Sequence, residues 1–273
     1  MSDLKALPEL NNLKTPAPRA KRREAEKICP RHGAYRSLSL MEGIWSPCPG
    51  CEEEEREAER ARQARHGRSL EQAARLIRAG VPPRFRQAAF DNFLAESPAQ
   101  REAREAAAAY AADFAEARRL GRCLAFVGAV GAGKSHLAVA VIRRISAAGF
   151  SARLSTVGDY FREIKDHSWG PGRDRRESEI LAEYAAPDLL VLDEVGVQYG
   201  TPAEENLLFT LFNKRYNELK PILVISNEDP EGLCKFLGER SFDRLRENGG
   251  LIIPFNWKSF RGRREEGREK RHC

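Results

Sequence analysis

Five short apolar runs alternate with longer helix-like stretches in the second half of the chain. They cover residues 123–127, 152–155, 189–192, 222–226 and 251–255. Uninterrupted apolar runs of this length are typical of strands buried on both faces, and the stretches between them would supply the covering helices. The pattern therefore predicts an α/β fold, with a five-stranded parallel sheet flanked by helices.

The first half of the chain lacks this alternation. Residues 1–27 carry prolines and charges with little periodicity, which predicts a flexible basic arm. Residues 52–79 are rich in Ala, Glu and Arg and contain no Pro, which predicts a charged helix with a break near Gly67. The Pro-Pro pair in residues 80–83 ends that helix, and a second Ala-rich helix is expected over 99–120.

One loop between a predicted strand and a predicted helix carries the complete pattern G-x-x-x-x-G-K-[ST]. Its glycines allow the backbone N–H groups to point inward at phosphate oxygens, and the start of the helix adds a positive dipole end. We expect Lys134 to reach the β- and γ-phosphates and Ser135 to bind Mg²⁺. The expected contacts with ATP or Mg²⁺ are Gly128, Ala129, Val130, Gly131, Ala132, Gly133, Lys134, Ser135, His136 and Asp193. The alternative, a Gly-rich turn that only connects strand to helix, is disfavoured by the complete pattern.

Two other apolar runs end at polar side chains. Asp193 and Glu194 follow the run 189–192, and Asn227 follows the run 222–226. The carboxyl ends of parallel strands lie at the ligand crevice. Asp193 is therefore expected to hold Mg²⁺, and Glu194 to act as general base toward the attacking water. Asn227 is expected to orient that water or to contact the γ-phosphate, the alternative being a polar residue that only caps a strand.

Near the N-terminus, Cys29-Pro-Arg-His32 and Cys48-Pro-Gly-Cys51 form the pattern C-x₂-H and C-x₂-C. Two such pairs can complete a tetrahedral Cys₃His shell around Zn²⁺. Four protein ligands fill the shell, so we expect a structural zinc that supplies folding energy to a segment too short for a core of its own. The alternative is a set of unrelated thiols with one histidine, and the pattern leaves open whether such a module binds protein or nucleic acid.

Composition bears on the partners and the compartment. The net charge of +6 and the pI of about 9.1 suit a polyanionic partner, although a mixed-charge surface gives the same values. The chain has no apolar run long enough for a membrane span and no apolar segment typical of a secretory signal, which together with the ATP motif favours the cytoplasm. Residues 263–273 form a basic tail that is either disordered or phosphate-seeking.

Taken together, these residues resemble the bacterial DnaC-type helicase loaders and the related transposition ATPases, a branch of the AAA+ superfamily. The resemblance covers residues 80–262. It rests on the sequences GVPPRFRQAAFDNF, GAVGAGKSHLA, LLVLDEVG, SN at 226–227, LGERSFDRLR and FNWKSFR. Phage- and prophage-encoded members, which often carry an N-terminal cysteine-rich segment, are most similar in layout.

The resemblance implies roles at the matching positions. Asn227 falls at the sensor-1 position, Arg244 at the arginine finger that acts on ATP held by a neighbouring subunit, and Arg261 at the sensor-2 position that contacts the γ-phosphate in cis. A guanidinium supplied in trans accelerates phosphoryl transfer by ~10³-fold or more. Self-association through these interfaces is thus implied. Arginines as dense as those around Arg244 are also common surface ion-pair partners.

The connection between the second and third predicted strands is longer than a single helix requires. In the initiator and loader branch of the AAA+ proteins, an extra helical element at this place lines a path for single-stranded DNA. Cations and aromatic side chains that suit such a path lie within residues 157–184: Phe161, Arg162, Lys165, His167, Trp169, Arg173, Arg175 and Arg176. A solvated loop has a similar composition, so both interpretations stay open.

The expected organisation is an arm at 1–27, a zinc-binding module at 28–51, a charged helix at 52–79, an AAA+ ATPase domain at 80–262 and a basic tail at 263–273. The expected function is an ATP-dependent helicase loader in DNA replication, whose N-terminal region holds a hexameric replicative helicase. The alternatives are a transposition-targeting ATPase on duplex DNA that recruits a transposase, a nucleotide-binding adaptor without turnover, and a small-molecule phosphotransferase.

Overall fold

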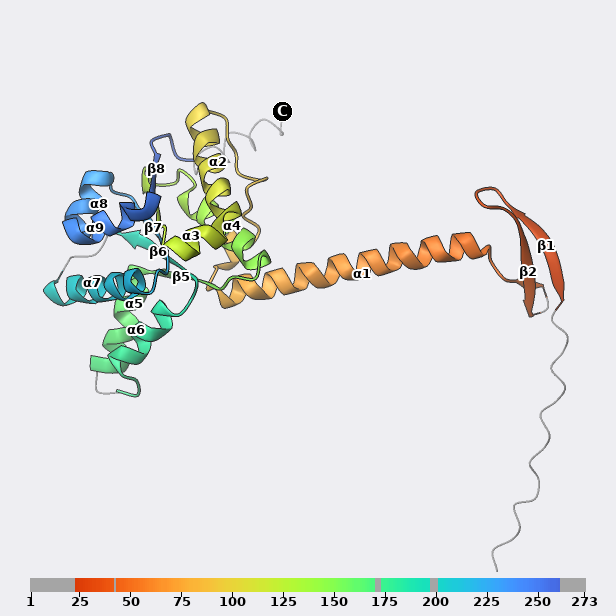
Figure 1. Ribbon diagram of the computed structural model, residues 1–273, viewed down its shortest axis with the longest axis horizontal. Helices are drawn as coiled ribbons and strands as arrows, with labels where there is room; N and C mark the ends of the chain where they lie inside the picture. Colours follow the sequence, from red (N-terminus) through yellow and green to blue (C-terminus); the bar gives the residue numbers. More distant parts are fainter. Residues whose placement is uncertain (1–22, 42, 170–172, 197–200, 261–273) are drawn as a thin grey trace, which may run out of the picture. The chain divides into compact units, whose positions relative to one another are not determined.

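The computed structural model describes residues 23–41, 43–169, 173–196 and 201–260, and the chain divides into two compact units, residues 1–67 and 68–273 (Figure 1). Among the described residues, no helix is both long enough and apolar enough to cross a membrane.

The first unit contains a small antiparallel sheet. Its strands are β1 (Glu24–Cys29), β2 (Gly33–Met41) and β3 (Ile44–Trp45), with β2 in the centre. Residues 24–27, which the sequence analysis assigned to the arm, lie in β1 and pair with β2. Main-chain hydrogen bonds order this strand, and such bonds require no apolar periodicity.

A single long helix, α1 (Pro49–Arg78), follows the sheet and continues into the second unit. The expected break near Gly67 is wrong, because the helix runs through this residue without interruption. A glycine inside a helix costs only about 1 kcal/mol relative to alanine. Ion pairs four residues apart, such as Arg56 with Glu52, support the exposed helix.

The second unit is built on a five-stranded parallel sheet. Its strands are β4 (Leu124–Gly128), β5 (Ala152–Thr156), β6 (Leu189–Val195), β7 (Ile222–Ser226) and β8 (Leu251–Phe255), in the order β5-β6-β7-β4-β8. All four neighbouring pairs are parallel. The predicted α/β fold is confirmed, and β7 lies between the strand of the phosphate loop and the strand of the acidic pair.

Helices cover both faces of this sheet. They are α2 (Pro98–Ala112), α3 (Phe114–Leu120), α4 (Lys134–Ala147), α5 (Val157–Ile164), α6 (Glu177–Ala185), α7 (Pro202–Asn217), α8 (Pro230–Leu237) and α9 (Glu239–Arg246). Single helical turns lie at Pro83–Phe85, Lys165–Trp169 and Glu247–Gly249. The helix expected over 99–120 is two helices, because the chain leaves helical geometry at Asp113 (φ −98°, ψ 25°).

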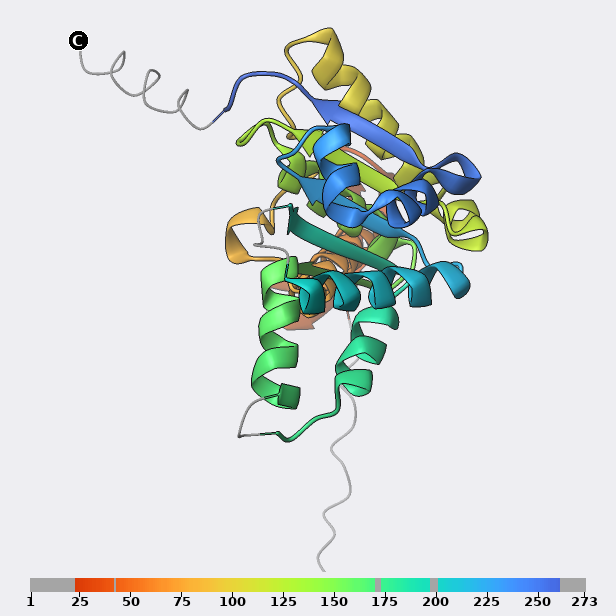
Figure 2. The same cartoon turned by 90° about the vertical axis from the view of Figure 1, so that its left-hand side faces the viewer.

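Side chains alternate between two apolar cores, one on each face of the sheet. In β4, Leu124 and Phe126 join the core formed with α2 and α4, whereas Ala125 and Val127 join the core formed with α5, α6 and α7. A strand with both faces buried reads as a continuous apolar run, which is why the sequence pattern located it. Figures 1 and 2 show α5 and α6 side by side, extending away from the sheet.

Candidate functional site

The loop between β4 and α4 has the backbone geometry of a phosphate-binding loop. Gly128, Gly131 and Gly133 have φ angles of +115°, +75° and +98°, which only glycine adopts without steric cost. The Nζ atom of the buried Lys134 donates to the carbonyls of Gly128 and Ala129 at 2.6 and 2.8 Å. The ammonium group is therefore held against the backbone of the loop.

Two of these glycines also permit close packing of distant segments against the loop. A Cβ atom on Gly133 would lie 2.6 Å from the ring of Phe93, and one on Gly128 would lie 2.8 Å from the carbonyl oxygen of Phe255. Both separations are shorter than any tolerable contact, so the loop admits no side chain at either position.

The hydroxyl of Ser135 donates to Oδ2 of Asp193 at 2.9 Å. Ser135 belongs to the first turn of α4 and Asp193 to β6, so this contact joins the two motifs across 58 residues of sequence. A hydroxyl beside a carboxylate is the pair of oxygen ligands that holds Mg²⁺ in P-loop proteins. The carboxylate of Asp193 therefore lies at the start of α4, directly after the loop.

A β-bulge places Glu194 next to this contact. The pairing of β6 with β7 shifts between Leu192 and Val195, and Glu194 has a φ of +61°. Its N–H donates to Oδ1 of Asp193 at 2.8 Å, and its side chain is exposed. A bulge redirects side chains and breaks the alternation of a strand. Such strain in a non-glycine residue is typical of functional sites.

Asn227 lies at the tip of β7 and is exposed to solvent. The serine before it is buried and donates its hydroxyl to the carbonyl of Val195 at 2.6 Å, which fixes the end of β7 to the end of β6. Asn227 thus follows a strand that lies between the strand of the phosphate loop and the strand of the acidic pair.

Three hydrogen bonds that the sequence analysis missed join the loop to the end of β8 and the chain after it. The N–H of Ala129 donates to the Phe255 carbonyl at 3.0 Å. The indole Nε1–H of Trp257 donates to the Ala132 carbonyl at 2.9 Å, and the N–H of Phe260 donates to the Gly131 carbonyl at 3.0 Å. The sequence FNWKSF marked this segment by its family resemblance, but no pattern in it indicated contact with the loop.

His136, which was expected among the ATP contacts, faces a different neighbour. Its Nε2 atom lies 3.0 Å from the Ala89 carbonyl, so this nitrogen carries the proton, and its ring meets the edge of Phe93 at 5.5 Å. Arg143 on the same helix donates to the carbonyl of Ala88 at 2.9 Å. These contacts fasten the segment before α2 along α4.

Arg244 is half-buried on α9, and its guanidinium lies 4.7 Å from the ring centroid of Tyr216 and 5.8 Å from that of Phe209. Its buried Nη1 atom has no hydrogen-bond partner among the described residues. Arg261, the expected sensor-2 residue, lies outside the described residues.

Comparisons with known proteins agree with this geometry. A family model described as "IstB-like ATP binding protein" matches residues 55–241, which is more than half of the chain. The chain belongs to this IstB-like ATP-binding family. The expectation of an ATP-binding domain is therefore confirmed at the level of the family.

Known relatives of this IstB-like chain include the replicative helicase loader DnaC of Escherichia coli K12. The two are 31% identical over 201 residues, which is 73% of this chain and 79% of the relative. A crystal structure of the DnaC helicase loader matches the fold with a TM-score of 0.56 and 24% identity, covering 63% of this chain and 99% of that one. The replication initiator DnaA, solved with AMPPCP and single-stranded DNA, matches with a TM-score of 0.53 and 23% identity, covering 65% of this chain and 51% of that one.

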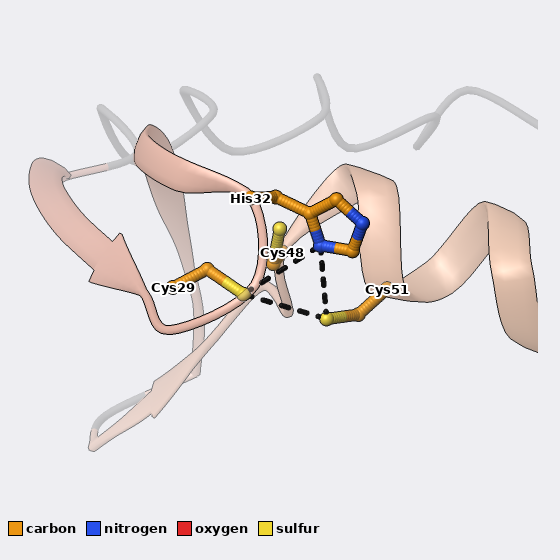
Figure 3. A group of neighbouring side chains, drawn as sticks. All are labelled: Cys29, His32, Cys48 and Cys51. Carbon is orange, nitrogen blue, oxygen red and sulfur yellow. Dashed lines mark hydrogen bonds between the residues drawn. The ribbon is translucent and has the colours of Figure 1, made fainter.

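The first unit brings together the four residues expected to bind zinc: Cys29, His32, Cys48 and Cys51 (Figure 3). One donor atom from each lies within 4.8 Å of the others. The Sγ atoms of Cys29 and Cys51 are 3.5 Å apart, and they lie 3.6 and 3.4 Å from His32 Nδ1. A tetrahedral zinc shell requires about 3.8 Å between two sulfurs and about 3.6 Å between sulfur and nitrogen. The donor set therefore fits Zn²⁺.

The second nitrogen of His32 is also held. Its Nε2 lies 3.2 Å from Oε1 of Glu54, which comes one turn after Cys51 on α1 and also pairs with Arg31. This carboxylate favours the tautomer in which Nε2 carries the proton and Nδ1 is available to a metal. Gly50 allows the approach, because a Cβ atom there would lie 2.7 Å from the His32 ring.

The two nearest thiols of the cluster differ in acidity. The main-chain N–H of Arg31, followed by the His32 side chain, lowers the pKa of Cys29 to about 6. The hydrogen bond with Cys29 raises the pKa of Cys51 to about 11. Adjacent thiolates repel each other, and a divalent cation held by the cluster would allow both to ionise.

The element between β5 and β6 departs in part from the expected DNA path. Phe161 is buried in the core, so its ring is not available to stack on a base. Arg175 pairs with Glu163 and Glu183. The expected side chains that remain exposed at the far end of α5 and α6 are Lys165, Trp169, Arg173 and Arg176. His167 is half-buried and pairs with Asp174, and Arg162 is exposed on α5 and pairs with Asp159.

Proposed function

We propose that this IstB-like protein is an ATP-dependent loader that delivers a hexameric replicative helicase to single-stranded DNA. The observation that carries the proposal is the 2.9 Å contact between Ser135 and Asp193, which supports one nucleotide site built from two distant motifs. The relatives named as replicative helicase loaders support the biological role.

In this proposal the loop binds the phosphates of ATP through its main-chain N–H groups and Lys134. Ser135 and Asp193 would hold Mg²⁺, which when bound neutralises charge on the β- and γ-phosphates. Glu194 accepts the proton of the attacking water, and Asn227 orients that water or contacts the γ-phosphate. Glu194 has a positive φ at the β-bulge, and this backbone geometry supports a side chain that the bulge directs toward the attacking water.

Two arginines would complete the site. Arg261 would contact the γ-phosphate within the same subunit, and Arg244 would reach ATP held by a neighbouring subunit. Since Arg244 stacks on Tyr216, assembly must draw its guanidinium away from that ring. The unsatisfied Nη1 atom supports such a move, because a buried N–H without a partner costs free energy that a phosphate contact recovers.

The zinc cluster would make the first unit a rigid module that, together with α1, holds the helicase. Its role is structural, because four protein ligands leave no open position. The three cysteines of the cluster are free, and free thiols persist in a reducing compartment, in keeping with the cytoplasm. Single-stranded DNA would be gripped by the exposed end of α5 and α6, where Trp169 supplies a stacking surface and Arg173 and Arg176 supply charge.

Glu194→Gln tests the nucleotide chemistry. The variant should bind ATP as the parent does and lose phosphate release by at least about 10²-fold, because the amide cannot accept the proton. Phosphate release is measured with and without single-stranded DNA. The matched control Glu102→Gln, on the exposed face of α2, should turn over normally. Normal turnover of Glu194→Gln would remove Glu194 from its proposed role.

Copurification tests the partner. The full chain is captured with candidate replicative helicases and with transposases, in the presence and absence of ATP, and the masses of the complexes are measured. A helicase hexamer retained with ATP supports loading. Retention of a transposase instead would favour the transposition-targeting function.

A further inference from the structure

Two carbonyl oxygens of the phosphate loop accept hydrogen bonds from the segment after β8. The carbonyl of Gly131 accepts from the N–H of Phe260, and the carbonyl of Ala132 accepts from the indole Nε1–H of Trp257. Ala132 is fully buried. Both carbonyls therefore point toward the same segment, on the side of the loop where Trp257 packs.

The geometry of the peptide bond fixes the direction of the N–H groups opposite these two carbonyls. The described residues contain no cis peptide bond, and in a trans peptide the N–H points away from the C=O of the same plane. The carbonyl of Gly131 shares its plane with the N–H of Ala132, and the carbonyl of Ala132 shares its plane with the N–H of Gly133. Holding the two carbonyls thus aims these two N–H groups away from Trp257 and Phe260.

We propose that Trp257 is a positioning residue of the nucleotide site. Its indole holds the Ala132 peptide plane so that the Gly133 N–H is presented to a phosphate oxygen before nucleotide arrives. Preorganised donors of this kind bind an anion without reorganising first. The inference rests on the proposed binding of ATP by this loop, and it adds a residue from 125 positions away in the sequence.

The hydrogen bond of Trp257 can be separated from its packing. Its ring lies 4.8 Å from that of Phe255, and a phenylalanine at this position would keep most of that contact while removing the N–H donor. Trp257→Phe should weaken the binding of both ATP and ADP by about three- to ten-fold, the range that one hydrogen bond supplies. Fluorescent nucleotide titration of the full chain measures both affinities, with Trp45→Phe in the first unit as the matched control.

A merely structural role for Trp257 predicts a different pattern. It predicts a lower melting temperature and no specific change at Gly133, whereas the proposed role predicts a shifted Gly133 amide resonance and weaker nucleotide binding, whatever the change in melting temperature. Unchanged nucleotide affinity in Trp257→Phe, beside a parent that binds ATP, would overturn the inference and leave the proposed function intact. A parent that binds no ATP would overturn both.

A second measurement uses the parent protein alone and requires no variant. In the parent, the indole N–H resonance of Trp257 should move when ADP is added, because the peptide plane that it holds carries a phosphate-binding N–H on its other edge. The indole resonance of Trp45 should stay in place. Equal and negligible shifts of both resonances at saturating ADP would contradict the proposal.

Discussion

At the scale of single residues, Arg215 is the largest side chain that the fold buries completely. Its guanidinium donates to the carbonyls of Tyr184, Ala185, Pro187, Asp188 and Pro221, at distances between 2.7 and 3.3 Å. Burial lowers its pKa to about 10, so the group remains charged at neutral pH. One cation thereby satisfies the carbonyls of the two turns that lead into β6 and β7.

Replacing Arg215 tests this function. Arg215→Met keeps the length of the side chain and leaves several buried carbonyls without a donor, each of which costs about 1–3 kcal/mol. We expect the free energy of unfolding of the second unit to fall by at least about 3 kcal/mol, measured by chemical denaturation. Arg119→Met, at an exposed position of α3, should change it by no more than about 0.5 kcal/mol. Equal stability of the two variants would contradict this account.

At the scale of elements, the cations around α5 and α6 fall into two groups. Near the sheet, Arg153 and Arg175 both pair with Glu163, and Arg153 also lies 3.7 Å from the ring centroid of Tyr184. These cations hold the two helices together. At the far end, Arg173 and Arg176 are exposed and line one pocket with Trp169, which is 49% exposed. Among the described residues of this element, the far end is the part whose exposed cations suit contact with a polyanion.

The double variant Arg173→Ala/Arg176→Ala tests the second group. It should weaken binding to single-stranded DNA for every sequence, because phosphate contacts carry no base information. Each lost phosphate contact should lower the salt slope by about 0.7, so the double change should lower it by about 1.4. Fluorescence anisotropy at several salt concentrations measures both. Arg119→Ala is the control, and an unchanged slope in the double variant would show that DNA is bound elsewhere.

At the scale of the whole molecule, the two units differ in what holds them together. Of the buried apolar side chains among the described residues, only Cys29 and Cys48 belong to the first unit, and both are in the metal cluster. The second unit has two apolar cores around its sheet. A unit without an apolar core requires another source of folding energy, and a metal ion bound by the cluster would supply it.

Removing zinc should therefore unfold the first unit alone. A strong zinc chelator should abolish the amide resonances of β1 and β2, while the melting temperature of the second unit changes by no more than about 2 °C. Cys48→Ser should have the same effect without chelator. Cys234→Ser, on α8, should retain one zinc per chain. Persistence of the β1 and β2 resonances in metal-free protein would show that the sheet needs no metal.

Local sequence patterns were sufficient to predict much of this protein. The predicted runs located the five parallel strands of the sheet, and the central strands β4 and β7 carry continuous apolar residues because both of their faces are buried. The phosphate loop and the four cysteine and histidine residues of the metal cluster also follow from the sequence, since short-range backbone geometry requires those residue types at those spacings. Segments ordered by main-chain pairing, such as residues 24–27, gave no comparable signal.

Contacts between distant segments were decided only by the tertiary structure. No spacing relates Trp257 to Ala132, Glu54 to His32 or Arg215 to its carbonyls, because each contact depends on how whole elements pack. The same holds for Phe161, which resembles a base-stacking residue in the sequence and lies in the core of the fold. Sequence determined which residues can perform the chemistry, and packing decided which of them face a ligand, because side-chain direction is a property of the assembled layers.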